Sequence, residues 1–329
     1  MKKIILLATG GTIASAKHSC GGPLRPSLEA AGLLEYIPQV RDICEPYARD
    51  IMFLDSSNIQ PEEWGDIARH IYGALSEYDG VVVTHGTDTL AFTTAMVSYM
   101  LRGLQKPVIF TGAQLPISEL MSDGRKNLEA AFAAAVNGTP GVYLLFDNKI
   151  INGTRAVKMR TMGFDAFQSI NAPVCGTVDS KGIIFSQPQP QSGQPQLIDK
   201  LCPDVFLLKV IPGTNPGIFD HIIKMGYRGI VIEAFGVGGL HFVKRNLAHK
   251  VDMLCQKGVA VVIISQCLYD SISLTVYEAG ALLPDCVING RDMTAEAAVT
   301  KLMWALGQTG SSQEIAHIIE TPLCGEIAG

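Results

Sequence analysis

Two short segments of this sequence place threonine hydroxyls beside glycines in a pattern that suggests nucleophilic chemistry. The first is residues 9–14, Thr-Gly-Gly-Thr-Ile-Ala, and the second is residues 84–89, Thr-His-Gly-Thr-Asp-Thr. Each follows an apolar run typical of a buried strand, so the glycines stand where the backbone turns sharply and approaches a ligand closely. A small polar substrate bound there would meet backbone N–H groups and threonine hydroxyls together.

A threonine hydroxyl is a poor nucleophile unless a nearby group accepts its proton. Asp88, in the second segment, supplies a carboxylate that can orient or charge-balance a general base. A lysine can be that base when burial lowers its pKa. Lys158 follows an apolar run at 141–146, but periodicity alone does not favour it over Lys149 or Lys181.

Other kinds of site fit the sequence less well. The first glycine turn lacks the G-x-G-x-x-G spacing of dinucleotide-binding loops and the Lys-Ser/Thr pair of P-loops. No G-x-S-x-G nucleophile elbow occurs. The seven histidines form no H-x-x-x-H pair, so no metal ligands are expected. We interpret His85 as a structural histidine at a strand end.

The composition excludes several classes of protein. The chain has 329 residues, 47% hydrophobic and 17% charged, which excludes wholesale disorder. The net charge of -5 argues against nucleic-acid binding. No apolar run reaches the length of a membrane span, and the run at residues 4–8 is too short for a signal peptide. We therefore expect a cytoplasmic protein with no membrane association, whose eight dispersed cysteines are reduced thiols.

In the first half of the chain, apolar runs alternate with helical patterns. Strands are predicted at 4–8, 80–84, 107–111 and 141–146, with a hairpin-like turn at 147–148 after the last. Helices are predicted at 61–78, at 89–102 and from a cap at Asp123 to residue 136, before Asn137-Gly138. Apolar strands without alternation, separated by helices, indicate a parallel sheet covered on both faces.

The second half repeats this alternation. Strands are predicted at 205–210, 230–234 and 259–265, and helices at 294–306 and 312–320. Between the halves, residues 187–196 are so rich in proline and glutamine that we expect them not to pack in a core.

These patterns predict an α/β fold with two domains. A larger N-terminal domain (1–186) with a mainly parallel sheet carries the catalytic residues, and a Pro/Gln-rich linker (187–203) joins it to a smaller C-terminal α/β domain (204–329). In open parallel sheets, ligands bind beyond the carboxyl ends of the strands, which is where both threonine–glycine segments lie.

The two threonine–glycine segments resemble the signature motifs of the bacterial-type L-asparaginase family. Other segments agree with the family pattern, at residues 55–58, 122–124, 163–167 and 292–294. The resemblance runs from residue 4 to the final helix, and without a signal peptide the chain is similar to the cytosolic type I branch. It implies an amidohydrolase that converts L-asparagine and water to L-aspartate and ammonia without a cofactor.

The resemblance also implies roles for the catalytic residues. Thr12 is the primary nucleophile, which attacks the side-chain amide carbon and forms an acyl-enzyme. Thr87, Asp88 and Lys158 form a second catalytic cluster, in which Lys158 and Asp88 tune Thr87 and the attacking water.

Substrate binding is assigned in the same way. Asp55, Ser56 and Ser57 match the segment that holds the α-amino and α-carboxylate groups of the substrate, and Asp88, beside Thr87, also faces the ammonium. An amino acid zwitterion needs carboxylates near its ammonium and hydroxyl or N–H donors near its carboxylate.

The turn glycines and one tyrosine complete the expected site. N–H groups at the turns of Gly11 and Gly86 are expected to stabilise an oxyanion. Many family members carry a tyrosine in the loop after the first motif, but residues 15–26 contain none. Some type I relatives use a tyrosine of the C-terminal domain instead, and Tyr277 lies in the matching segment. We expect Tyr277 to support catalysis, with packing near a domain interface as the alternative.

Three alternatives accompany this interpretation. The first is mixed asparagine and glutamine specificity, since one methylene changes pocket fit by only about 1–3 kcal/mol. The second is an amidotransferase component that releases ammonia for a partner, although such relatives usually carry an extra N-terminal domain. The third is a non-catalytic amino-acid-binding regulatory domain. The resemblance further implies a homodimer or homotetramer, with each site completed near a dimer interface by the partner's C-terminal domain.

Overall fold

The computed structural model describes residues 1–16, 25–274, 280 and 282–328. The chain divides into two compact units, Met1–Asp199 and Lys200–Gly329. The division falls inside the segment 187–203 that the sequence indicates as a linker.

The first unit is built on a mixed eight-stranded sheet. Its strands, in order across the sheet, are β13 (Gly182–Phe185), β12 (Gly176–Asp179), β9 (Lys149–Asn152), β8 (Gly141–Phe146), β7 (Pro107–Thr111), β5 (Gly80–Thr84), β1 (Lys3–Gly10) and β4 (Glu45–Leu54). The five strands from β8 to β4 are parallel, whereas β9, β12 and β13 pair antiparallel.

The mixed sheet corrects the expectation of a mainly parallel one. Asp147 and Asn148 both have positive φ, 45° and 63°, and they form the tight turn that reverses the chain between β8 and β9. The sequence analysis predicted this turn, but not the antiparallel strands that follow it.

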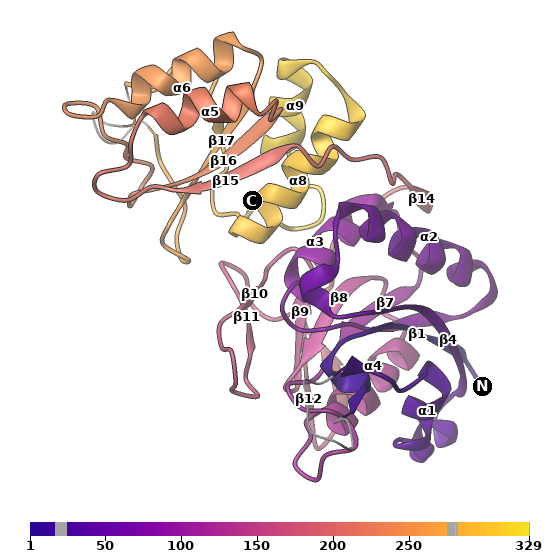
Figure 1. Ribbon diagram of the computed structural model, residues 1–329. Helices are drawn as coiled ribbons and strands as arrows, with labels where there is room; N and C mark the ends of the chain where they lie inside the picture. The colour runs from indigo at the N-terminus through magenta and orange to yellow at the C-terminus, as the bar shows by residue number, and fades with distance from the viewer. Residues whose placement is uncertain (17–24, 275–279, 281, 329) are drawn as a thin grey trace. The chain divides into compact units, whose positions relative to one another are not determined.

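Helices cover both faces of this sheet, with α1 (Ala30–Glu35) and α4 (Gly124–Asn137) on one face and α2 (Pro61–Glu77) and α3 (Leu90–Met100) on the other (Figure 1). Along β1, Ile4 and Leu6 join the core under α1 and α4, whereas Ile5 and Leu7 join the core under α2 and α3. A strand buried on both faces has no polar alternation, which explains the continuous apolar runs in the sequence.

Short elements lie between these strands and helices. They are η1 (Thr12–Ala14), β2 (Ser15–Ala16), β3 (Arg25–Pro26), η2 (Pro38–Asp42), η3 (Ser56–Asn58), β6 (Leu101–Arg102), β10 (Ala156–Lys158), β11 (Phe167–Ser169) and β14 (Gln196–Leu197). Two of them, β10 and β11, form an antiparallel hairpin.

The second unit contains a parallel four-stranded sheet. Its strands, in order, are β15 (Val205–Lys209), β16 (Gly229–Ala234), β17 (Ala260–Ser265) and β18 (Ile288–Asn289). The helices are α5 (Gly217–Lys224), α6 (Leu247–Gln256), α8 (Ala295–Gln308) and α9 (Ser312–Glu320). Helices α5 and α6 share a core with β16 and β17, while α8 contacts β15, β16 and β17.

The proline- and glutamine-rich segment differs from the unpacked linker that we expected. Gln189 is only 4% exposed. Its Oε1 accepts a hydrogen bond from the backbone N–H of Val142 at 2.8 Å, and its Nε2 donates to Asn152 Oδ1 at 3.0 Å. A long amide side chain can thus enter the first unit because it satisfies buried polar groups there.

The cysteines also differ from expectation in one place. Cys255, at the end of α6, forms a disulfide with Cys286, in the loop before β18, with their Cα atoms 6.2 Å apart. These residues are 31 positions apart in the sequence, so only the fold brings them together. Among the helices formed by the described residues, none is both long enough and apolar enough to cross a membrane.

Candidate active site

The carboxyl ends of β1 and β5 meet through glycines that leave no room for a side chain. A Cβ on Gly11 would lie 2.4 Å from the backbone nitrogen of Gly86, and a Cβ on Gly86 would lie 2.6 Å from Ser56 Oγ. Gly11 also has a φ of 78°, which side chains rarely adopt. The loops after β1, β4 and β5 therefore touch, and this contact places Thr12, Thr87 and Ser56 around one point.

The Gly11 N–H group itself has a partner in this structure. It donates to the carbonyl oxygen of Leu54 at 3.0 Å, and the Gly11 carbonyl accepts from Ser15 Oγ at 2.9 Å. The contribution of Gly11 that this geometry supports is close packing of two backbones, and not the donation to an oxyanion that we expected.

Thr12 is the first residue of η1, directly after β1, and its side chain is half-buried. Within the described part of the chain, no group forms a hydrogen bond with its hydroxyl. This hydroxyl is therefore available to a ligand at the carboxyl edge of the sheet.

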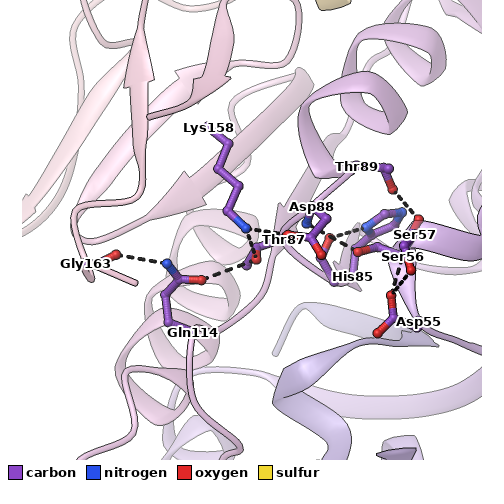
Figure 2. A network of polar contacts seen from close by, with 11 residues as sticks. Asp55, Ser56, Ser57, His85, Thr87, Asp88, Thr89, Gln114, Lys158 and Gly163 are labelled. Atoms are coloured by element: carbon purple, nitrogen blue, oxygen red, sulfur yellow. Dashed lines mark hydrogen bonds and ion pairs between the residues drawn. The ribbon is translucent and has the colours of Figure 1, made fainter. Parts of the chain in front are cut away.

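Lys158, the last residue of β10, lies at the centre of a polar cluster (Figure 2). Its Nζ donates a hydrogen bond to Thr87 Oγ1 at 2.8 Å and forms an ion pair with Asp88 Oδ1 at 2.6 Å. The side chain of Lys158 is 18% exposed and that of Asp88 is 63% exposed, so solvent reaches the pair from the Asp88 side. Of the other two lysines that the sequence left open, Lys149 begins β9 and Lys181 lies in the exposed turn between β12 and β13.

Gln114 belongs to the same cluster, although sequence reasoning missed it (Figure 2). Its Oε1 accepts the hydroxyl proton of Thr87 at 3.3 Å, and its Nε2 donates to the carbonyl oxygen of Gly163 at 3.0 Å. The Thr87 hydroxyl is thus held between Lys158 as donor and Gln114 as acceptor. No spacing rule marks Gln114, because its role depends on where the loop after β7 passes.

Asp123 supports the loop that carries Gln114. The sequence predicts Asp123 as a helix cap, but its carboxylate makes no capping bond with α4. It accepts instead from the backbone N–H groups of Gln114, at 3.0 Å, and Leu115, at 3.1 Å. Burial raises the pKa of Asp123, and these hydrogen bonds act in the opposite direction.

The segment expected to bind the substrate lies against the second motif. Asp55 caps η3, and its Oδ1 accepts from Ser57 N at 2.9 Å and from Ser57 Oγ at 2.6 Å. These hydrogen bonds lower the pKa of Asp55, so its carboxylate stays ionised. Ser56 Oγ accepts from the Asp88 N–H at 3.2 Å, and the Ser56 carbonyl accepts from Thr89 Oγ1 at 2.7 Å (Figure 2).

The site described here is formed within the first unit alone. Tyr277, expected to assist Thr12, lies outside the described residues. Among the residues that are described, no three metal-binding side chains gather into one cluster, and we assign no metal ligands.

Comparison with known proteins places this geometry in context. Residues 3–191 match the family described as "Asparaginase, N-terminal", and residues 204–319 match the "Glutaminase/Asparaginase C-terminal domain". The chain is 42% identical over 330 residues to an L-asparaginase of Thermococcus kodakarensis, and the match covers 99% of each chain. It is 34% identical to a component of the glutamyl-tRNA(Gln) amidotransferase of Methanopyrus kandleri, of which the match covers 76%.

Solved structures give the same pattern. The thermostable L-asparaginase from Thermococcus kodakarensis has a TM-score of 0.94 at 41% identity, with 99% of each chain covered. A probable cytoplasmic L-asparaginase from Campylobacter jejuni has a TM-score of 0.83 at 27% identity, with 97% of this chain and 99% of the other covered.

Proposed function

Because this chain belongs to the asparaginase family along both of its domains, we propose that it hydrolyses L-asparagine through an acyl-enzyme formed on Thr12. The L-asparaginase activity follows from 42% identity over the full chain to a curated L-asparaginase. The reaction converts L-asparagine and water to L-aspartate and ammonia. The residues that perform it are the subject of the proposal.

In the first step, the Thr12 oxygen attacks the side-chain amide carbon of the substrate. The C–N bond breaks, the nitrogen leaves as ammonia with the hydroxyl proton, and a β-aspartyl ester remains on Thr12. The free hydroxyl of Thr12, beside the contact between Gly11 and Gly86, supports this role. In the second step, water attacks the ester carbon, aspartate leaves and the hydroxyl is restored.

The second cluster handles the protons and the water. The observation that carries this assignment is the position of Lys158 Nζ, 2.8 Å from Thr87 Oγ1 and 2.6 Å from Asp88 Oδ1. To act as a base, Lys158 first loses a proton, and the Thr87 hydroxyl then turns from Gln114 to Nζ. The Thr87–Gln114 contact of 3.3 Å is long for a hydroxyl hydrogen bond, so this rotation costs little.

The substrate's α-amino and α-carboxylate groups select the remaining residues. Asp55, whose pKa is lowered, and the partly exposed Asp88 offer two carboxylates to the ammonium. Ser56 and Ser57 place hydroxyl groups near the substrate carboxylate. Asparagine and glutamine differ by one methylene, so mixed specificity stays an alternative that the assay below decides.

Amidotransferase and regulatory functions have weaker support. The amidotransferase relative is matched over 76% of its length, whereas the L-asparaginase is matched over 99%. The intact set of Thr12, Thr87, Asp88 and Lys158 argues for a catalytic site over a regulatory binding domain.

We further propose that the chain is cytoplasmic and forms a homodimer or homotetramer. The cytoplasmic location draws on the Campylobacter jejuni relative. The assembly draws on Met162 and Phe164, which are 86% and 42% exposed and flank Gly163, the residue bound to Gln114. Large apolar side chains so exposed beside the site suit coverage by a second copy. Light scattering of the purified protein gives the mass, and a monomer mass would contradict the proposal.

The main experiment measures ammonia release from L-asparagine, with L-glutamine and D-asparagine in parallel. We expect release from L-asparagine that Thr12→Ala abolishes, by about 10⁴-fold or more. Thr177→Ala, at an exposed threonine of β12, is the matched control and should behave like the wild type. Full activity of Thr12→Ala would exclude Thr12 as the nucleophile.

The acyl-enzyme is tested separately by trapping. Hydroxylamine competes with water for a β-aspartyl ester, so the wild type should form β-aspartyl hydroxamate from L-asparagine. If water attacks the amide directly, hydroxamate should stay at the level of the Thr12→Ala protein. Tyr277→Phe in the same assay tests the supporting tyrosine.

A further inference from the structure

His85 stands immediately before the second catalytic motif and is completely buried. Its backbone N–H donates to the Thr111 carbonyl at 2.9 Å, which extends the pairing of β5 with β7. Its imidazole contacts both the backbone of the motif and helix α3, and Figure 2 shows it beside Thr87 and Asp88.

The imidazole is part of a hydrogen-bond chain with a fixed direction. The Trp64 indole N–H, which can only donate, bonds Thr93 Oγ1 at 3.0 Å. The Thr93 hydroxyl is then free to donate to His85 Nε2, also at 3.0 Å. With Nε2 as acceptor, the ring carries its proton on Nδ1, which donates to the Gly86 carbonyl at 2.7 Å.

The last bond of this chain acts on the peptide plane before Thr87. The Gly86 carbonyl and the Thr87 N–H belong to one planar trans peptide, so holding the oxygen fixes the direction of the N–H and the orientation of the Thr87 Cα. Gly86 has no side chain to restrict its own dihedral angles, so an external bond is needed to hold this plane. Burial lowers the pKa of His85 to about 4, which keeps the ring neutral near pH 7.

We infer that Trp64, Thr93 and His85 form a positioning chain for Thr87, in which the Nδ1–H of His85 holds the Gly86–Thr87 peptide so that the Thr87 hydroxyl meets Lys158. His85 makes no contact with the substrate in this scheme. The inference rests on the proposed function, because it assumes that the contact between Thr87 and Lys158 serves the reaction.

The first test is spectroscopic and independent of activity. In protein labelled with ¹⁵N-histidine, long-range ¹H–¹⁵N correlation distinguishes a protonated from an unprotonated ring nitrogen, and His85→Asn assigns the signal. We expect His85 to carry its proton on Nδ1 at pH 7. A proton on Nε2, or on both nitrogens, would overturn the inference.

The second test compares two amides at position 85. The side-chain nitrogen of asparagine lies where His85 Nδ1 lies, so His85→Asn keeps a donor for Gly86, whereas His85→Gln moves its amide nitrogen toward Thr93. We expect kcat for L-asparagine to fall about 10- to 100-fold in His85→Gln, with a smaller change in KM, because a misplacement near 1 Å has effects of this size. His85→Asn should recover at least tenfold of that loss. Equal kcat values in the two variants would refute the positioning role.

Two further substitutions keep the test decisive if His85→Gln does not fold. Thr93→Val removes the hydroxyl that sets the tautomer, whereas Thr93→Ser keeps it, so kcat should fall in the valine variant alone. His70→Gln, at an exposed histidine of α2, is the control for the histidine change. If Thr87→Ala keeps full activity while the Nδ1 tautomer is observed, the proposed function fails. If Thr87 is essential and both pairs show no difference, the positioning chain fails alone.

Discussion

Each unit of this protein contains a lysine paired with a carboxylate, and the two pairs differ in what surrounds them. In the first unit, Lys158 and Asp88 lie 2.6 Å apart at the edge of a sheet, with the Asp88 side chain 63% exposed. In the second unit, Lys301 and Glu326 lie 2.5 Å apart with neither side chain exposed. The chemical groups are almost the same, so their surroundings decide their use.

The surroundings of Lys301 leave nothing for a ligand. Its Nζ also donates to the carbonyls of Ile319, at 2.8 Å, and Thr321, at 2.7 Å. Glu326 accepts from the N–H groups of Leu323 and Cys324. These bonds tie α8 to the C-terminal segment, and the comparison teaches that a charge pair becomes reactive when part of its shell is left to solvent and substrate.

The strongest way to break this comparison is Lys158→Met. We expect kcat to fall by about 10²- to 10⁴-fold, since a positioned acid–base group contributes that much. The free energy of unfolding should change by less than about 1 kcal/mol, because the pair is partly exposed. Ammonia release and urea unfolding measure the two effects, and Lys149→Met is the control. A kcat within tenfold of the wild type would remove Lys158 from the reaction.

The opposite result is expected for Lys301→Met. The Glu326 carboxylate would stay buried without a cation, so the free energy of unfolding should fall by about 3–5 kcal/mol. The kcat of the protein that stays folded should equal that of the wild type. Lys257→Met, at an exposed lysine, should leave stability unchanged. A small loss in Lys301→Met, equal to that of the control, would show that the two pairs are alike.

The disulfide sharpens the contrast between the units. The Cys255–Cys286 bond closes a loop of 31 residues in the second unit, and chain entropy predicts a contribution of about 3–4 kcal/mol. The Cys255→Ser, Cys286→Ser double variant should lose this amount in urea unfolding. A reductant should lower the stability of the wild type toward that of the double variant and leave the double variant unchanged. A wild type insensitive to reductant would mean that the bond contributes no stability.

The smallest expected effect concerns His85 and pH. Its pKa is about 4 in the folded protein against an ordinary 6.5, so between these values the unfolded chain binds more protons. The stability from neutral His85 is therefore complete above about pH 6.5 and is lost as the pH falls toward 4, by about 3 kcal/mol in total. Unfolding curves of the wild type and His85→Asn, measured from pH 7 to pH 4, should converge by this amount. Parallel pH dependences would show that His85 titrates normally.

The sequence predicted the centre of the fold better than its edges. Residues 80–84, 107–111 and 141–146 coincide with β5, β7 and β8, because strands covered on both faces appear as uninterrupted apolar runs. β4 was missed, because an edge strand with partly exposed residues, from Glu45 to Leu54, lacks that pattern. The antiparallel β12 and β13 were missed for the same reason.

The candidate site divides in a similar way. Thr12, Thr87 and Asp88 stand at strand ends next to glycines, so local sequence marks them. Gln114 acts through a loop whose path depends on Asp123, and no local pattern encodes that path. Gln189 was misread, because composition predicts average behaviour and a single buried amide depends on the partners that the fold provides.

The contact of Gly11 with Gly86 also bears on how activity returns after refolding. The two glycines meet only when β1 lies parallel to β5, a pairing that joins Ala8 to Thr84 across a long stretch of chain. Such non-local parallel pairings form slowly compared with helices. Regain of asparagine hydrolysis should therefore lag behind regain of helical circular dichroism, which makes enzymatic turnover a reporter of the late steps of folding.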